Sequence, residues 1–351
     1  MITIIILAAI FLFLIILAAL SAYLLLFHLG PGPVSRILRK AFEKSPAKPP
    51  DDFSRILSES QDFPDIEYPS EYGGNTLDIF LPRKDGQLFP LILWTHGGGF
   101  VGGDKKDVYF FARTLASCGC AVVSLNYELA PEGRYPTPLI QMNEVYRYLS
   151  VYEEKYSLDL KNIFLAGDSA GAHIAGQAAC AISDSDYAKT LPFRIDIPTD
   201  HLKGVLLYCG LFSMQEKIFQ SRNPLLREIW RTIAWSYFGE KKWQDGHLSH
   251  ETDIIQHVSG RFPPVFITDG NTFSFEEQAK KLADRLSQLN VSVSSLFFPA
   301  NEYRTLHEYQ FIQNTYPAQI AVEQTLAFLE KYVGDSEGLT PNINESGSVI
   351  S

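Results

Sequence analysis

The chain starts with a long apolar stretch that carries no charged side chain. It runs from residue 1 to residue 27 and consists mainly of Ile, Leu, Ala and Phe. A helix needs about 20 apolar residues to cross a bilayer. A cleaved signal peptide fits less well, because no basic residues precede the stretch and no site of the A-x-A kind ends it. The pattern therefore predicts one uncleaved transmembrane helix over residues 1–28.

Basic residues follow this stretch at once. They are Arg36, Arg39, Lys40, Lys44 and Lys48, and only the α-amino group stands on the other side. The positive-inside rule then predicts a single-pass membrane protein whose main domain lies in the cytoplasm. Residues 34–44 mix basic and apolar positions at near-helical spacing, which suits either a helix on an anionic membrane surface or part of a cap. Residues 29–60 are therefore interpreted as a juxtamembrane linker or cap segment.

Further along, short apolar runs alternate with segments of helical periodicity. This alternation is typical of a parallel sheet with helical crossovers. The predicted strands are residues 91–94, 121–125, 163–166, 202–208, 265–268 and 291–298, and helices are expected at 109–116, 139–152 and 276–289. We predict one α/β domain over residues 61–333, with a mostly parallel central sheet and helices on both faces.

One insertion interrupts the alternation, at about residues 212–260. It is rich in aromatic side chains, namely Trp230, Trp235, Tyr237, Phe238 and Trp243. An insertion of this length between strands predicts a helical cap. Its aromatic residues either line a pocket or form the core of the cap itself. Residues 334–351 are rich in Ser, Gly and Asn with few apolar positions, so we expect a disordered tail.

Charge and cysteine content exclude several functions. The formal net charge is −10, which argues against nucleic acid as a partner because a polyanion would be repelled. The four cysteines are Cys118, Cys120, Cys180 and Cys209. Their spacing suggests buried, reduced thiols rather than a disulfide framework, and it lacks the paired ligands of a zinc site.

The pentapeptide at residues 167–171, G-D-S-A-G, fits the G-x-S-x-G pattern. In this motif a sharp turn from strand to helix exposes a nucleophilic serine at the edge of a sheet. The context agrees, because an apolar run precedes the motif and an Ala-rich helical segment follows it. Ser169 is therefore the candidate nucleophile.

A second glycine-rich motif, H-G-G-G-F, occupies residues 96–100 and follows another apolar run. Backbone N–H groups of glycines can approach a developing oxyanion closely, because no Cβ stands in the way. The two motifs together indicate acyl transfer.

The general base is chosen from eight histidines. In folds with this serine turn, the histidine follows the last strand of the sheet, and His307 has that position. His173 lies four residues beyond Ser169, one helical turn below the nucleophile and directed away from it. We therefore predict His307 as the base and His173 as a packing residue.

These motifs resemble those of the hormone-sensitive-lipase group of α/β-hydrolases. A third matching segment is residues 127–132, Y-E-L-A-P-E, where Glu128 replaces the usual arginine. The resemblance extends over residues 68–332. It implies an α/β-hydrolase fold and hydrolysis of small or lipophilic carboxylic acyl esters without a metal or organic cofactor. It also implies that the N–H groups of Gly98, Gly99 and Ala170 form the oxyanion hole, and that His96 and Asp168 brace their loops.

The acidic member of the catalytic triad is where this chain departs from the group. Thr272 stands at the acid's usual place, and a threonine cannot stabilise an imidazolium by charge. Two carboxylates lie nearby, Asp269 at the end of a strand and Glu276 at the start of a helix. We favour Asp269 because strand ends fix side chains better, although Asp269 also suits a turn and Glu276 a first helical turn. The missing acid keeps a second hypothesis open, a catalytically silent binding or scaffold protein of the same fold.

Overall fold

The computed structural model describes residues 2–43, 46–84 and 86–333, with the side chains of residues 2–9, 25, 219 and 220 left undescribed. The tail expected at residues 334–351 lies outside the described residues.

The centre of the molecule is an eight-stranded sheet with the order β1-β2-β4-β3-β5-β6-β7-β8. The strands are β1 (Ser60–Glu67), β2 (Thr76–Pro82), β3 (Phe89–Thr95), β4 (Ala121–Leu125), β5 (Leu158–Asp168), β6 (Leu202–Tyr208), β7 (Val265–Thr268) and β8 (Val293–Leu296). The pairs β1–β2 and β2–β4 are antiparallel, and the remaining pairs are parallel. The prediction of a mostly parallel sheet is confirmed.

The sequence analysis missed the two antiparallel strands. β1 is largely exposed and contains a proline, so it has neither the apolar run nor the clean alternation that marks a strand. By contrast, β3, β4 and β7 are buried at every position. Strands buried on both faces read as continuous apolar runs, and for that reason these three were visible in the sequence. β2 is largely buried as well, but Asp78 interrupts its apolar run.

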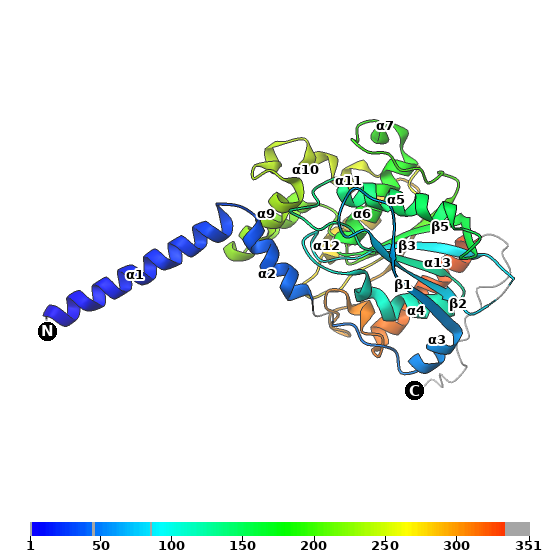
Figure 1. The fold of residues 1–351 in the computed structure, drawn as a ribbon, viewed down its shortest axis with the longest axis horizontal. Coiled ribbons are helices and arrows are strands. Elements are labelled where there is room, and N and C mark those ends of the chain that lie inside the picture. Colours follow the sequence, from blue (N-terminus) through cyan, green and yellow to red (C-terminus); the bar gives the residue numbers. More distant parts are fainter. Residues whose placement is uncertain (1, 44–45, 85, 334–351) are drawn as a thin grey trace.

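Helices cover both faces of the sheet (Figure 1). The long ones are α4 (Tyr109–Ser117), α5 (Thr137–Val151), α6 (Ala170–Ser183), α12 (Glu276–Gln288) and α13 (Tyr316–Tyr332), and the short ones are α3 (Phe53–Glu59), α7 (Ser185–Ala188) and the 3-10 turns η1 (Lys105–Val108) and η3 (Tyr309–Phe311). Leu91 and Leu93 point into the core beneath α5, α6 and α12. Ile92 and Trp94 point into the core beneath α4 and α13. Alternate side chains of the same strand, β3, therefore pack into the hydrophobic cores on both faces of the sheet.

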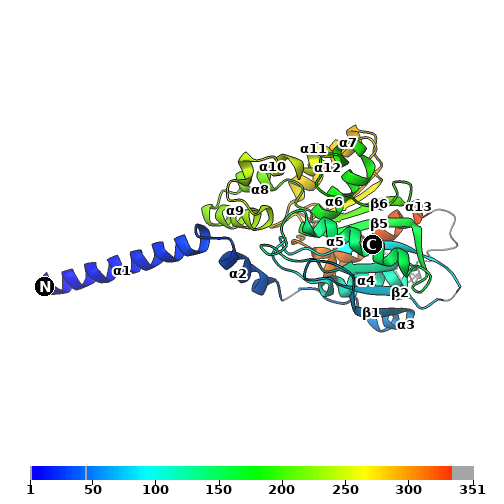
Figure 2. The same cartoon turned by 45° about the horizontal axis from the view of Figure 1, so that its top comes forward.

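The segment between β6 and β7 is helical and lies above the sheet (Figure 2). It contains α8 (Met214–Gln220), α9 (Pro224–Phe238), η2 (Trp243–Asp245), α10 (Leu248–Glu251) and α11 (Ile254–His257). Tyr237 and Trp243 are buried, and Tyr237 stacks on Phe100 with ring centroids 3.9 Å apart. These aromatic residues therefore anchor the cap to the glycine-rich loop.

Two helices precede the sheet. α1 (Ile2–Phe27) extends away from the rest of the molecule, and α2 (Gly32–Phe42) packs against α9 (Figures 1 and 2). The Ser35 and Ser236 hydroxyls are 2.7 Å apart, and the Arg39 guanidinium donates to the carbonyl of Val101 at 2.9 Å. These contacts place α2 against the segment between β6 and β7. The two alternatives for residues 29–60 stay a prediction.

Within the part of the chain that the structure describes, no helix meets the length and apolarity that crossing a membrane requires.

Candidate active site

Ser169 lies at the sharp turn between β5 and α6. Its φ is +52° and its ψ is −115°, a conformation that few non-glycine residues adopt. A Cβ on Gly167 would come within 2.4 Å of the Gly171 backbone, and one on Gly171 within 1.9 Å of the Thr95 carbonyl oxygen. Glycine at both positions is what lets the turn close. The predicted nucleophile therefore lies directly after the end of β5, and the residue is 7% exposed.

His307 meets this serine from the loop between β8 and α13. Its Nε2 lies 3.0 Å from the Ser169 Oγ, which is a hydrogen-bond distance. The imidazole also packs edge-on against the Phe275 ring, with centroids 5.1 Å apart. Two residues separated by more than a third of the chain are thus brought into proton-transfer contact.

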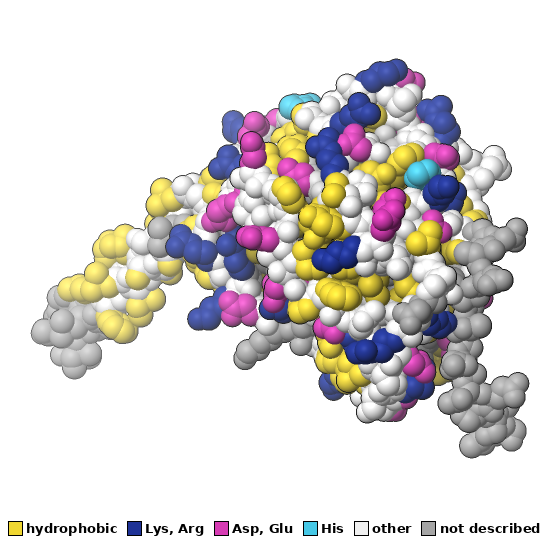
Figure 3. Space-filling view, turned by 45° about the vertical axis from the view of Figure 1, so that its right-hand side comes forward, with side chains coloured by type: hydrophobic (Ala, Val, Ile, Leu, Met, Phe, Trp, Pro, Cys, Tyr) yellow, Lys and Arg dark blue, Asp and Glu magenta, His cyan; other side chains and the backbone are white. Residues whose placement is uncertain are grey.

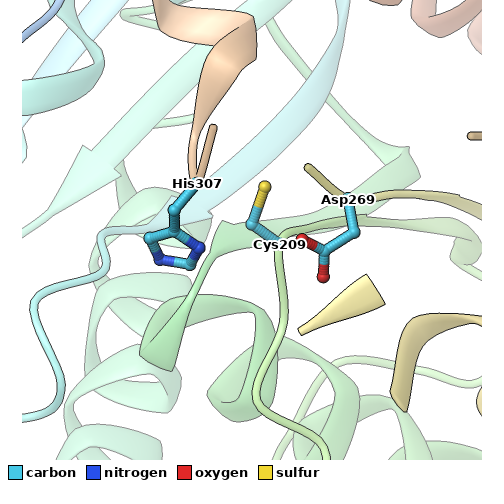
Figure 4. A group of neighbouring side chains, drawn as sticks. All are labelled: Cys209, Asp269 and His307. Atoms are coloured by element: carbon cyan, nitrogen blue, oxygen red, sulfur yellow. The ribbon is translucent and has the colours of Figure 1, made fainter. Parts of the chain in front are cut away.

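The other ring nitrogen of His307 does not bond a carboxylate directly. His307 Nδ1 lies 2.7 Å from the Ser274 Oγ, and the Ser274 hydroxyl donates to Asp269 Oδ1. Asp269 is fully buried at the end of β7. One of its carboxylate oxygens lies within 4.8 Å of a ring nitrogen of His307 (Figure 4). Asp269 is therefore close to the imidazole, with a hydroxyl between them.

The other two candidates for the acid's place point elsewhere. Glu276 forms an ion pair with Lys280 at 2.9 Å. The Thr272 hydroxyl donates to the Asn271 side chain at 3.0 Å. Among the described residues, neither side chain has a hydrogen bond to His307. Ser274 was missed by the sequence analysis, because a lone serine in a loop carries no motif.

The glycine-rich loop passes beside Ser169, and it is tightly packed. Gly98 has a φ of +98° and Gly99 one of +59°. A Cβ on Gly98 would lie 2.1 Å from the carbonyl oxygen of Gly102. Both the backbone angle and the contact exclude a side chain there.

Two buried side chains hold this loop. Asp168 accepts hydrogen bonds from the Trp94 indole and the Gly97 N–H, both at 2.8 Å. The His96 ring stacks on Tyr127 with centroids 4.5 Å apart, and burial lowers its pKa to about 4. His96 is therefore neutral at physiological pH, and both residues brace the loop as the resemblance implies.

The N–H groups expected to hold the oxyanion are free in the described structure. No acceptor among the described residues takes a hydrogen bond from the N–H of Gly98 or Gly99. Ala170 is the first residue of α6, so its N–H has no partner within the helix. The structure thus leaves three donors available near the nucleophile.

A cavity of about 760 Å³ opens above these groups. Ser169, His307 and the glycine-rich loop form its floor, and Trp230 and Ile233 of α9 and Phe42 of α2 contribute to its walls. The volume is within the range of small-molecule sites. The lining combines apolar residues of α9 and α2, which suit an acyl chain, with charged residues such as Lys217, Glu276 and Glu277.

Charged groups around the imidazole set its protonation. Burial and, to a smaller extent, the positive charge of Lys217 together lower the pKa of His307 to about 4. Glu308, which the sequence analysis did not single out, has its Oε1 3.4 Å from His307 Nε2, and burial raises the pKa of this carboxyl to about 7. At neutral pH the imidazole is therefore uncharged and able to accept a proton.

This electrostatic environment predicts the pH dependence of kcat/KM. As the predicted base, His307 would work only when its imidazole is neutral, and its pKa lies below the ordinary value of about 6.5. We expect kcat/KM to stay constant as pH falls through 6.5 and to decrease only as pH approaches about 4. Lys217→Met should move this acid limb to higher pH. Circular dichroism at each pH separates unfolding from protonation, and an acid limb near 6.5 in the wild type would contradict the assignment.

The remaining titratable residues have other roles. His173 is buried and its Nδ1 lies 2.7 Å from the Leu211 carbonyl oxygen, as expected for a packing residue. All four cysteines are free; three of them are buried as predicted, whereas Cys118 is half-buried. Cys209 lies beside Asp269 and His307 (Figure 4). These three do not suit a metal, because Ser169 and Ser274 occupy both His307 nitrogens and burial raises the pKa of the thiol.

Comparison with known proteins agrees with this arrangement. A profile of the alpha/beta hydrolase fold matches residues 92–307. The chain is 32% identical over 247 residues to an acetyl esterase of Salmonella choleraesuis (strain SC-B67), covering 68% of this chain and 72% of that protein. An acetyl esterase of Salmonella schwarzengrund (strain CVM19633) is 31% identical over 247 residues, with the same coverage of both chains.

Two solved structures share the fold. Inhibited esterase B from Lactobacillus rhamnosis superposes with a TM-score of 0.70 at 22% identity, covering 85% of this chain and 93% of that one. The hyperthermophilic esterase from the archaeon Pyrobaculum calidifontis superposes with a TM-score of 0.65 at 21% identity, covering 90% and 96%.

Proposed function

The chain belongs to the hormone-sensitive-lipase-like carboxylesterase family of α/β-hydrolases and is a carboxylic ester hydrolase, and we propose that it cleaves small or lipophilic acyl esters through an acyl-enzyme on Ser169. The observation that carries this proposal is the 3.0 Å contact between the Ser169 hydroxyl and His307 Nε2. That contact lies in the lining of the cavity, with free backbone donors beside it. The scaffold hypothesis has no comparable observation in its favour.

In the proposed reaction, Ser169 attacks the acyl carbonyl while His307 takes the hydroxyl proton. The N–H groups of Gly98, Gly99 and Ala170 stabilise the negative charge that develops on the carbonyl oxygen. His307 then protonates the leaving alkoxide, and water hydrolyses the acyl-enzyme by the same steps in reverse order. An ester is favoured over an amide because an alkoxide leaves more easily.

A series of p-nitrophenyl esters from acetate to palmitate tests this proposal, combined with labelling by a serine-directed fluorophosphonate. We expect turnover of short and medium acyl chains and stoichiometric labelling, because the apolar cavity walls can accommodate an acyl group. The profile across chain lengths measures how deep the acyl site is. Absence of both turnover and labelling in the folded wild type would instead establish the scaffold hypothesis.

We propose Asp269 as the triad acid, which predicts a contrast between two variants. Asp269→Asn should lower kcat by about 10²–10⁴-fold, because the charge that stabilises the imidazolium is lost. Glu276→Gln should stay within about twofold, since its carboxylate pairs with Lys280. Steady-state kinetics with one p-nitrophenyl ester compares the two. A larger loss in Glu276→Gln would assign the acid to Glu276 instead.

We also propose that the apolar segment of residues 1–27 anchors the protein in a membrane; the side chains of residues 2–9 and 25 lie outside the described part, to which the absence of a membrane-spanning helix refers. The sequence of residues 1–27 has no charge, and the described large apolar side chains between Ile10 and Leu24 are exposed (Figure 3). A helix that is apolar all round and extends away from the rest of the protein over most of its length (Figure 1) suits a bilayer. The basic residues that follow favour a cytoplasmic catalytic domain.

Removal of residues 1–28 tests the anchor. The full chain should sediment with membranes after a carbonate wash. The truncated chain should remain in the supernatant with kcat for a water-soluble ester within about twofold, because the cavity is formed by residues after 40. A full chain that stays in the supernatant would contradict the proposal.

A further inference from the structure

The loop between β7 and α12 places a serine between the imidazole and the carboxylate. We propose that Ser274 is a positioning residue that links His307 to Asp269, in place of the direct bond between a histidine and an acid. The inference rests on the proposed function, because it concerns how His307 is oriented for its work as the base.

The hydrogen bonds give the link a direction. A hydroxyl has one proton to donate and two lone pairs to accept with. Ser274 gives its proton to Asp269, so it accepts one from His307 Nδ1, 2.7 Å away. The proton of the neutral ring is therefore on Nδ1, and Nε2 presents its lone pair to Ser169 at 3.0 Å. This is the tautomer that a general base requires.

Asp269 is held in place for this role. It is 0% exposed, and its Oδ1 also accepts a weak bond from the Phe275 N–H at 3.4 Å. Its Oδ2 has no partner among the described residues. The carboxylate therefore reaches the imidazole through one hydroxyl, and without that hydroxyl both Oδ1 and His307 Nδ1 would lose their strongest described partner.

The loop sequence explains why a hydroxyl is needed. Thr272 stands where the group's acid would be, and its hydroxyl is turned to Asn271. Its backbone N–H bonds to the Thr305 carbonyl at 3.0 Å, which fixes the loop to the segment before His307. Asp269 lies five residues before Ser274, and no direct hydrogen bond joins its described carboxylate to the His307 ring. Ser274 fills the gap that this displacement leaves.

Kinetics of single and double variants of the full chain test the link. Ser274→Ala should lower kcat by about 10²-fold with little change in KM, because the ring loses its orientation while the acyl site is intact. Ser274→Thr keeps a hydroxyl and should restore kcat to within about tenfold of wild type. Thr272→Ala removes a neighbouring hydroxyl that does not touch His307, and as the matched control it should stay within about twofold.

The double variant gives the sharpest result. If Asp269 acts through Ser274, then Asp269→Asn added to Ser274→Ala should cost little more than the larger single loss. Multiplying losses would show that the two residues act independently and would overturn the proposal. A Ser274→Ala enzyme within twofold of wild type would overturn it as well.

Two further measurements separate orientation from folding and from the reaction itself. The low-field proton resonance of His307 Nδ1 should be present in wild type and Ser274→Thr, and lost or shifted in Ser274→Ala, whereas the melting temperature reports stability alone. If Ser274→Ala does not fold, kcat of Ser274→Thr is compared with kcat of Ser274→Val. Only the threonine variant keeps the hydroxyl, so only it should retain activity. Wild-type turnover and fluorophosphonate labelling test the proposed function independently of all these variants.

Discussion

Ser169→Ala is expected to lower kcat for a p-nitrophenyl ester by about 10⁶-fold and to abolish fluorophosphonate labelling. Losses of this size follow removal of the nucleophile in other serine hydrolases, where the oxyanion donors and substrate binding leave a residual rate. The same residue is expected to carry both readouts, because the acyl group and the phosphonate each need the Ser169 oxygen. Stopped assays over long incubations are required to measure so small a rate.

The fold should tolerate this change. The described hydrogen bond of the Ser169 hydroxyl is the one to His307, and alanine has the same Cβ at the same positive φ. A melting temperature within a few degrees of wild type is therefore the control. Activity above about one per cent of wild type, after exclusion of contaminating esterases, would show that another residue is the nucleophile.

The parts of the fold that the sequence predicted are those with a local signature. β3, β4 and β7 are buried on both faces and appear as short apolar runs. The turn at Ser169 and the loop at Gly98 could also be predicted from the sequence, because each conformation requires glycine at fixed positions where a Cβ would clash. In these cases the steric constraint acts between residues that are close in the sequence, so a short sequence motif is enough to predict the conformation.

The missing parts depend on contacts between distant segments. Ser274 acquires its role only because β7 ends beside the loop that carries His307, and the pairing of Thr272 with Leu306 holds the two together. α2 packs against α9 because Ser35 meets Ser236, 201 positions away. A hydroxyl in a loop has many ordinary uses, and no local pattern distinguishes these from the rest.

The acid shows how the two kinds of information combine. The sequence predicted that Asp269 and Glu276 lie near His307, but it gave no distance from either carboxylate to the imidazole by which to choose the triad acid. The structure separates them, since Glu276 turns to Lys280 and Asp269 reaches the imidazole through Ser274. Burial outweighs the hydrogen bond from Ser274, which favours the charged form, and the pKa of Asp269 is raised to about 7. The hydrogen bond from Ser274 therefore limits the rise of this pKa.

His307→Ala should reduce kcat nearly as much as loss of the nucleophile, by about 10⁵–10⁶-fold, because a neutral serine hydroxyl is a poor nucleophile without a base. Fluorophosphonate labelling should slow in parallel, since it uses the same activated oxygen. His247→Ala is the matched control. This side chain is 81% exposed and does not line the cavity, so activity should not change.

The combination of the two variants carries the strongest test. Residues that act as one unit are not additive, so Ser169→Ala with His307→Ala should be no slower than Ser169→Ala alone. The reason is geometric: the imidazole contributes by accepting the proton from an oxygen 3.0 Å away, and once that oxygen is gone it has nothing to activate. A double variant slower by the product of both losses would mean that His307 acts on the substrate separately from Ser169, and the acyl-enzyme mechanism would have to be abandoned.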